Sequence, residues 1–167
     1  EVAVRGRDLT PWGLVAQPLF QGPPDSALVV GTCAHLGRVA AQGLTKVVGV
    51  FPTAVFPPGL GSFVGEVMDL LGLPRRFLLF AFHGEGASAR AEELRMQGFP
   101  AFVHGEEWIE AEALPCPRRG RVYWVSGVDH ARAHDLALDC GAQLLSGPYV
   151  GREVAFPPYQ LVRRRAR

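Results

Sequence analysis

The feature that most constrains the fold of this chain recurs four times: an amphipathic helical stretch, then a glycine, then a short apolar run. Glycine accepts the left-handed backbone conformation that follows a helix end, so each of these glycines marks a helix stop. They are Gly43, Gly72, Gly98 and Gly141. The repeated order of helix and apolar run predicts alternating helices and strands, which defines the α/β class.

The apolar runs after these glycines are hydrophobic on both alternating faces, as in residues 46–50 and 77–82. Strands of a parallel sheet covered by helices have this composition. The stretches Leu14 to Phe20 and Arg121 to Val125 are two further strand candidates, giving roughly six β/α units. A complete eight-stranded β/α barrel typically needs about 200 residues or more, so we expect an incomplete or modified β/α barrel.

Composition excludes several classes of protein. A net charge of +1 and a hydrophobic fraction of 48% exclude a disordered chain. Most of the basic surplus lies in the last five residues, which we interpret as a solvated tail rather than a nucleic-acid footprint. We therefore expect one domain over residues 1–155, a C-terminal tail over residues 156–167, and no nucleic-acid partner.

Membrane insertion and a disulfide framework are also unsupported. The longest charge-free stretch, Val47 to Val64, contains three prolines that break any spanning helix. Three cysteines without paired spacing argue against structural disulfides and zinc ribbons, and favour a reducing, cytoplasmic location. Cys33 and Cys140 lie on helix faces that we expect to be buried.

Histidines supply the few candidate reactive groups. His83 and Glu85 follow an apolar run, where β/α proteins place chemistry, but the adjacent glycines more simply mark a turn. His104 follows another such run. His130 and His134 have a spacing that can bind a metal, yet no third ligand accompanies them, so we expect a solvated helix face. We assign no catalytic residue, no metal site and no cofactor on these residues.

The order of segments resembles the EAL-domain family, the cyclic-di-GMP phosphodiesterases and their inactive relatives, whose fold is a modified β/α barrel. Residues 14–20 look like the family's first strand with its Tyr-Gln-Pro-Ile motif, and residues 43–52 are similar to the strand with its Val-Asn-Val-Ser-Pro motif. Residues 125–129 look like Ala-Glu-Gly-Val-Glu, and residues 146–152 resemble Gln-Gly-Tyr-Leu-Phe-Gly-Arg. The resemblance covers most of the chain in order.

The departures from the family concern its metal ligands, because family catalysis uses divalent metal ions held by carboxylates and an Asn. The Glu-Ala-Leu segment is missing, the family's Asn falls on Gly49, and the Glu of the following strand falls on Phe80. The paired Asp falls near Val103 and His104, and one Glu is replaced by Ser126. The Lys-Ile-Asp strand has no apparent counterpart, so we interpret residues 105–120 as an exposed connection left by its deletion. These losses predict that the chain is not an enzyme.

The resemblance therefore implies a catalytically inactive EAL-like domain that acts as a protein-interaction or regulatory module in bacterial signalling. Missing strands would leave open sheet edges, which a protein partner or a second copy would cover. A first alternative is a non-catalytic cyclic-di-GMP receptor, for which the matching ligand-facing positions are Gln17, Pro18, Asp129 and Arg152. A second alternative is an unrelated small α/β enzyme, which would need a cluster of carboxylates or histidines at the strand ends.

Overall fold

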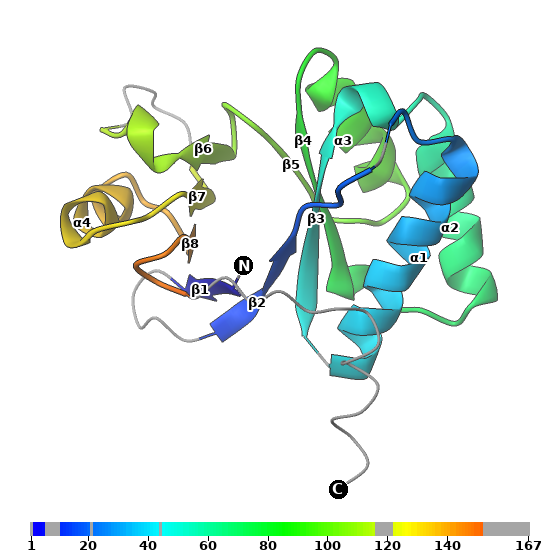
Figure 1. The fold of residues 1–167 in the computed structure, drawn as a ribbon, viewed down its shortest axis with the longest axis horizontal. Helices are drawn as coiled ribbons and strands as arrows, with labels where there is room; N and C mark the ends of the chain where they lie inside the picture. Colours follow the sequence, from blue (N-terminus) through cyan, green and yellow to red (C-terminus); the bar gives the residue numbers. More distant parts are fainter. Residues whose placement is uncertain (1, 6–10, 21, 44, 116–121, 152–167) are drawn as a thin grey trace, which may run out of the picture.

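The fold is an eight-stranded sheet that curls into a barrel, with helices on its outside (Figure 1). The computed structural model describes residues 2–5, 11–20, 22–43, 45–115 and 122–151. The strand order is β5-β4-β3-β2-β1-β8-β7-β6. The strands are β1 (Val2–Arg5), β2 (Pro11–Ala16), β3 (Lys46–Pro52), β4 (Leu78–His83), β5 (Ala101–Val103), β6 (Trp108–Glu110), β7 (Trp124–Ser126) and β8 (Leu144–Ser146).

One strand runs against the others. β1 is antiparallel to both of its neighbours, β2 and β8, and the remaining ladders are parallel. The two strands at the ends of the order, β5 and β6, meet through an isolated parallel bridge between His104 and Trp108. The expected modified β/α barrel is confirmed, and the six strands expected from the sequence correspond to β2, β3, β4, β5, β7 and β8, whereas β1 and β6 were not expected.

Four α-helices cover the outside of the barrel: α1 (Ser26–Gly43), α2 (Leu60–Leu70), α3 (Ala87–Met96) and α4 (Ala131–Asp139). Three short 3-10 turns, at Thr53–Val55, Arg75–Phe77 and Ala111–Ala113, lie between them. In Figure 1 the first three helices pack on the right of β3, β4 and β5, and α4 packs on the left beside β6, β7 and β8. The glycines after α2, α3 and α4, namely Gly72, Gly98 and Gly141, have φ values of 63°, 82° and 82°, which explains these three helix stops.

The alternation of side chains along the strands divides the core into an inner and an outer part. Val48, Val50, Leu79 and Ala81 face the interior of the barrel, where they meet Phe102 and two tryptophans. The residues between them in sequence face the helices. Phe51, Phe80 and Phe82 pack there with Phe56 and Phe99 under α1, α2 and α3. A third, smaller cluster includes Ile109, Val125 and Leu145 and lies under α4. The strands are apolar on both faces because both faces are buried.

The interpretation of residues 105–120 as an exposed connection was wrong for its first part. Trp108 and Ile109 lie in β6, and each is only 7% exposed. β6 comes between β5 and β7 in the chain, at the place where we had expected the Lys-Ile-Asp strand to be deleted. A strand is therefore present there, Trp108-Ile109-Glu110, and it ends in a carboxylate.

The outer edge of β5 is satisfied from within the chain. The Glu107 carboxylate accepts a hydrogen bond from the Val103 backbone N–H at 3.1 Å, and the Arg95 guanidinium donates to the Ala101 carbonyl at 2.8 Å. Arg95 and Glu107 also form an ion pair at 2.7 Å. The expected requirement for a partner to cover an open edge therefore loses its structural reason at this strand.

Two cysteines expected to be buried differ in their exposure. Cys33 is buried, and this burial raises the pKa of its thiol to about 12, whereas Cys140 is half-buried rather than buried as expected. Across the described residues, no helix combines the length and apolar character needed to span a membrane. The expected boundary between a domain at 1–155 and a tail at 156–167 lies outside the described residues.

Candidate functional site

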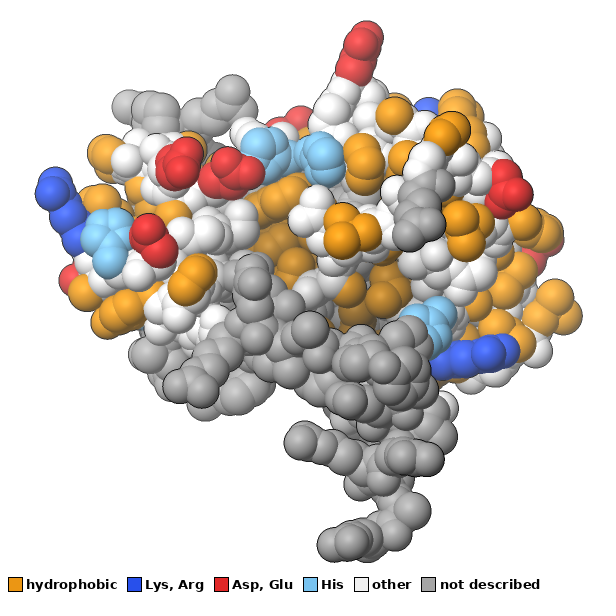
Figure 2. Space-filling view, in the orientation of Figure 1, with side chains coloured by type: hydrophobic (Ala, Val, Ile, Leu, Met, Phe, Trp, Pro, Cys, Tyr) orange, Lys and Arg blue, Asp and Glu red, His pale blue; other side chains and the backbone are white. Residues whose placement is uncertain are grey.

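A cleft of about 910 Å³ opens at the carboxyl ends of the parallel strands. Each of the strands β2 to β8 contributes a residue from its end or from the loop that follows. The polar lining residues are Gln17, His83, His104, Glu110, Glu112 and Ser126, and the apolar lining residues include Val15, Val50, Trp108 and Trp124. Figure 2 shows the hollow, with hydrophobic side chains on its floor and histidine and acidic side chains along one rim. β/α barrels place their chemistry at this end.

Two imidazoles stand beside each other at the rim. His83 ends β4, and His104 directly follows β5, the neighbouring strand, with its backbone N–H donating to the Phe82 carbonyl at 2.9 Å. Both rings lie edge-on to the indole of Trp108, with ring centroids 6.4 Å and 4.7 Å away respectively. The His104 Nε2 atom lies 3.7 Å from the Glu110 Oε1 atom. The cleft therefore carries two histidines, one of which is paired with a carboxylate.

The floor of the cleft is fixed by two stacked tryptophans. The indoles of Trp108 and Trp124 stack with centroids 4.8 Å apart and planes inclined by 15°. Each indole N–H donates to a serine on the next strand, Trp108 to Ser126 at 2.7 Å and Trp124 to Ser146 at 2.9 Å. Buried indoles need such partners. This arrangement holds the Trp108 ring in place against the two imidazoles.

The structure separates the four ligand-facing positions that the sequence suggested. Gln17 lines the cleft, and half-buried Pro18 follows it in the chain without lining the cleft. Asp129 is exposed, and its Oδ1 atom lies 2.6 Å from Nδ1 of the neighbouring His130, away from the cleft lining. Arg152 lies outside the described residues. Of the positions that the structure describes, Gln17 is the one placed to meet a ligand in this cleft.

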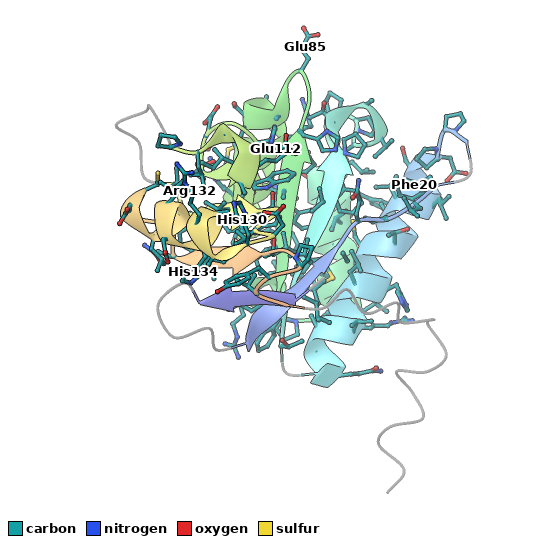
Figure 3. All side chains as sticks on the ribbon, turned by 60° about the vertical axis from the view of Figure 1, so that its left-hand side comes forward. Phe20, Glu85, Glu112, His130, Arg132 and His134 are labelled. Carbon is teal, nitrogen blue, oxygen red and sulfur yellow. The ribbon has the colours of Figure 1, made fainter. Side chains whose placement is uncertain are left out.

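The other histidine motifs of the sequence have surroundings that differ from those expected from their spacing. In Figure 3 Glu85 projects away from the body of the molecule, so it does not pair with His83, which lines the cleft. His130 and His134 lie on the outer side of the barrel with α4 (Figure 3). His134 pairs with Asp135 at 3.0 Å and is largely buried against Tyr149, which differs from the fully solvated face that we expected.

Comparison with known proteins identifies the fold. The sequence matches no protein-family model and no curated protein. Among solved structures, the chain matches the PaMucR phosphodiesterase in complex with cyclic-di-GMP with a TM-score of 0.64, 13% identity and coverage of 96% of both chains. It matches the EAL domain of Mycobacterium smegmatis DcpA with a TM-score of 0.61, 14% identity and coverage of 90% of this chain and 89% of the other.

A third match is to part of a longer protein. The EAL enzyme Bd1971, in its form bound to cAMP and cyclic-di-GMP, gives a TM-score of 0.64 at 8% identity over 92% of this chain. The match spans 60% of the length of that enzyme. The expected likeness to EAL domains is thus confirmed, and at these identities it establishes an EAL-type fold.

The expectation that the chain is not an enzyme was wrong. It rested on the loss of family metal ligands, but the matched structures include an EAL enzyme and a phosphodiesterase, so the fold is an enzyme fold. The cleft is also lined by His83, His104, Glu110 and Glu112, the kind of residues at strand ends that the alternative of a small α/β enzyme would need. The physical reason for the error is that Glu110 and Glu112 lie at the end of a strand that the sequence did not reveal.

The residues present do not fit the metal ions that the family uses. The resemblance matches Gly49 and Phe80 to the family's Asn and Glu, but both positions face the helices. A Cβ on Gly49 would meet Leu36 of α1, and Phe80 packs under the helices. Their inward-facing neighbours are the apolar residues Val48, Val50, Leu79 and Ala81. Within the described part of the chain, no group of three His, Cys, Asp or Glu side chains is placed to hold a metal ion. The oxygen-rich ligand set that Mg²⁺ requires is therefore not assembled by these residues.

Proposed function

We propose that this domain binds cyclic-di-GMP in the cleft and acts as a regulatory, cytoplasmic module of bacterial cyclic-di-GMP signalling. The observation that carries the proposal is the cleft itself, at the carboxyl ends of seven strands of an EAL-type fold. A volume of about 910 Å³ suits a ligand of nucleotide size. Solved structures with this fold include PaMucR in complex with cyclic-di-GMP.

The lining of the cleft suggests how a guanine nucleotide is held. No lysine or arginine occurs among the described lining residues, whereas Glu110 and Glu112 supply carboxylates. A carboxylate accepts hydrogen bonds, and the guanine base offers N–H donors on its Watson–Crick edge. Because Glu110 is paired with His104, Glu112 is the carboxylate left to accept from the base. The two imidazoles and the Gln17 amide are then the donors for the phosphates.

Calorimetry tests this proposal directly. Titration of the purified domain with cyclic-di-GMP, with and without Mg²⁺, should give a Kd of about 10 μM or tighter. Glu112→Ala should weaken binding by about tenfold, because a hydrogen bond to a charged acceptor is lost. Cyclic-di-AMP should bind more weakly than cyclic-di-GMP to the wild type, since adenine lacks the N1–H and 2-amino donors.

The matched control for Glu112→Ala is Glu85→Ala, which removes a carboxylate that points away from the molecule (Figure 3). Glu85→Ala should bind cyclic-di-GMP like the wild type. An absence of heat with the folded wild type at high protein concentration would refute the proposed ligand. Equal loss of affinity in both variants would refute the role of Glu112.

Protein contact, the role first expected from the sequence, is a second candidate, and the exposed apolar face of α2 favours it. Phe63 and Leu70 lie seven residues apart on one side of α2 and are 51% and 86% exposed, and Leu71 beside them is 40% exposed. In Figure 2 hydrophobic side chains reach the surface on the right, where α1 and α2 lie in Figure 1. Exposed large apolar side chains that cluster in this way mark contact surfaces.

We expect this face to pair with a second copy of the chain. Light scattering after size exclusion should show the mass of the wild type rising toward that of a dimer as concentration increases. The double variant Phe63→Ser, Leu70→Ser should remain a monomer, because the apolar area that drives association is removed. A wild type that is monomeric at all concentrations would exclude this candidate.

A further inference from the structure

We infer that His83 and His104 cleave ribonucleotide phosphodiesters without a metal ion, by acid–base catalysis in the cleft. The inference rests on the proposed function, because cyclic-di-GMP is such a phosphodiester. Its starting point is the disagreement between fold and residues. The matched structures include a phosphodiesterase, and the resemblance to its family implies catalysis by metal ions, yet the described residues of the cleft do not form a metal site. What they form instead is a pair of imidazoles.

The spacing of the two imidazoles suits a single phosphodiester. Phe82 and Val103 are register partners in the parallel ladder of β4 and β5, and His83 and His104 are the next residues of the two strands. Adjacent positions on neighbouring strands lie about 5 Å apart. Both side chains line the cleft, and both rings are positioned by the same indole, that of Trp108. A phosphate that lies over the ends of these two strands can therefore be reached by both imidazoles.

The surroundings of the two histidines distinguish their roles. Glu110 on β6 lies beside His104, with its Oε1 atom 3.7 Å from Nε2, and His83 on β4 and Glu112 after β6 line the same cleft. A carboxylate next to an imidazole orients the ring for proton transfer, as in other histidine–carboxylate pairs. His104 therefore acts as the general base and His83 as the general acid. Glu110 is a positioning residue, because it acts through His104.

The chemistry is transesterification within a ribonucleotide. His104 takes the proton from a ribose 2′-hydroxyl, and the 2′-oxygen attacks the adjacent phosphorus to form a new P–O bond. The bond from phosphorus to the 5′-oxygen of the other nucleotide breaks, and that oxygen takes a proton from protonated His83. The product is a linear dinucleotide with a 2′,3′-cyclic phosphate at one end and a 5′-hydroxyl at the other. No water is consumed, so the product has the mass of the substrate.

The mass of the product makes the test sharp. Cyclic-di-GMP is incubated with the wild type in EDTA and followed by liquid chromatography with mass detection. The expected first product is an isomer of unchanged mass, whereas hydrolysis would give a product heavier by one water. His83→Ala and His104→Ala should each lower the rate by about 100-fold or more, which is typical for the loss of an acid or base. His35→Ala, which removes an exposed histidine of α1, is the matched control and should retain the full rate.

Two further measurements separate chemistry from structure. The 2′-deoxy analogue of cyclic-di-GMP should bind but not be cleaved, because it lacks the attacking oxygen. Glu110→Gln should lower kcat with KM nearly unchanged, and Glu110→Asp should restore part of kcat. A merely structural role for Glu110 would instead lower the thermal stability of both variants without this difference in kcat.

The outcomes distinguish this inference from the proposed function. Binding of cyclic-di-GMP without turnover in EDTA, or a first product heavier by one water, would overturn the inference and leave the proposed function standing. Failure to bind cyclic-di-GMP would refute the proposed function. In that case the linear ribodinucleotide GpG is the second probe: its conversion to a 2′,3′-cyclic phosphate would support the inference, and its persistence would overturn it.

Discussion

Replacement of Phe80 by alanine should lower the free energy of unfolding by about 3–5 kcal/mol, the typical loss for a fully buried phenylalanine. Phe80 is 0% exposed and lies at the centre of a cluster of aromatic rings. Its ring centroid lies 5.3 Å from that of Phe99, 5.9 Å from those of Phe51 and Phe56, and 6.2 Å from that of Phe82. The cluster joins β3, β4 and the segment before β5 to the helices, so the neighbouring backbone cannot easily close the cavity.

Urea unfolding followed by tryptophan fluorescence measures this loss. Met96→Ala, which truncates a 73%-exposed side chain of α3, is the control and should change the free energy of unfolding by less than about 0.5 kcal/mol. Phe80→Leu should lie between the two, because it keeps most of the apolar volume, and it remains measurable if Phe80→Ala does not fold. A loss in Phe80→Leu no larger than in Met96→Ala would show that this cluster does not hold the barrel wall to its helices.

The central strands could be predicted from the sequence because their signal is long and uninterrupted. The apolar runs at 46–50 and 77–82 correspond to β3 and β4, and both faces of these strands are buried. β6 carries only three residues, Trp108–Glu110, between acidic neighbours. Three residues are too few for a periodic pattern to be recognised. Its burial depends on tertiary packing, which puts Trp108 inside the barrel and Ile109 under α4.

The candidate site could be predicted in its parts but not in its pairing. His83 and His104 were placed at strand ends by the sequence, and Gln17 was placed beside a ligand. The acid closest to His83 in sequence is Glu85, but it follows a glycine with a φ of 99° and points away (Figure 3). The acid that pairs with His104 comes from β6, beyond a tight connection. The pairing required the fold, because the chain leaves the β4 strand at Gly84, so the alternation of side chains along the strand no longer places Glu85.

The metal ligands illustrate the same dependence on the facing of side chains. Matching the sequence to the family placed the missing Asn at Gly49, but the structure turns that position toward α1. The conclusion about ligand loss on β3 does not depend on this one position, because Val48 and Val50, the neighbours that face inward, are also apolar. A one-residue shift along a strand moves a side chain to the other face of the sheet, and comparison of sequence motifs alone does not detect such a shift.

Glu107→Ala should lower the free energy of unfolding by about 1–3 kcal/mol and cause the protein to self-associate. The Glu107 carboxylate accepts a hydrogen bond from the Val103 N–H, and Val103 is only 3% exposed. Glu107→Ala removes the acceptor that the structure shows for this backbone donor, so the expected cost is that of a buried unsatisfied group. The Arg95 guanidinium, which also donates to the Ala101 carbonyl, loses its ion-pair partner at the same edge.

Glu107→Gln is the matched control, because its amide oxygen can still accept from the Val103 N–H while the charge is lost. The Arg95–Glu107 pair is about one-third exposed on each side, so solvent screens it and the charge alone contributes less than about 1 kcal/mol. Urea unfolding should therefore rank the variants as wild type, Glu107→Gln and Glu107→Ala, in order of falling stability. At matched concentration, light scattering should show species larger than those of the wild type in Glu107→Ala but not in Glu107→Gln. Equal stability of the two variants would mean that the charge, rather than the backbone acceptor, protects the β5 edge. In that case the hydrogen bond from the Val103 N–H would not be what makes a partner unnecessary at this edge.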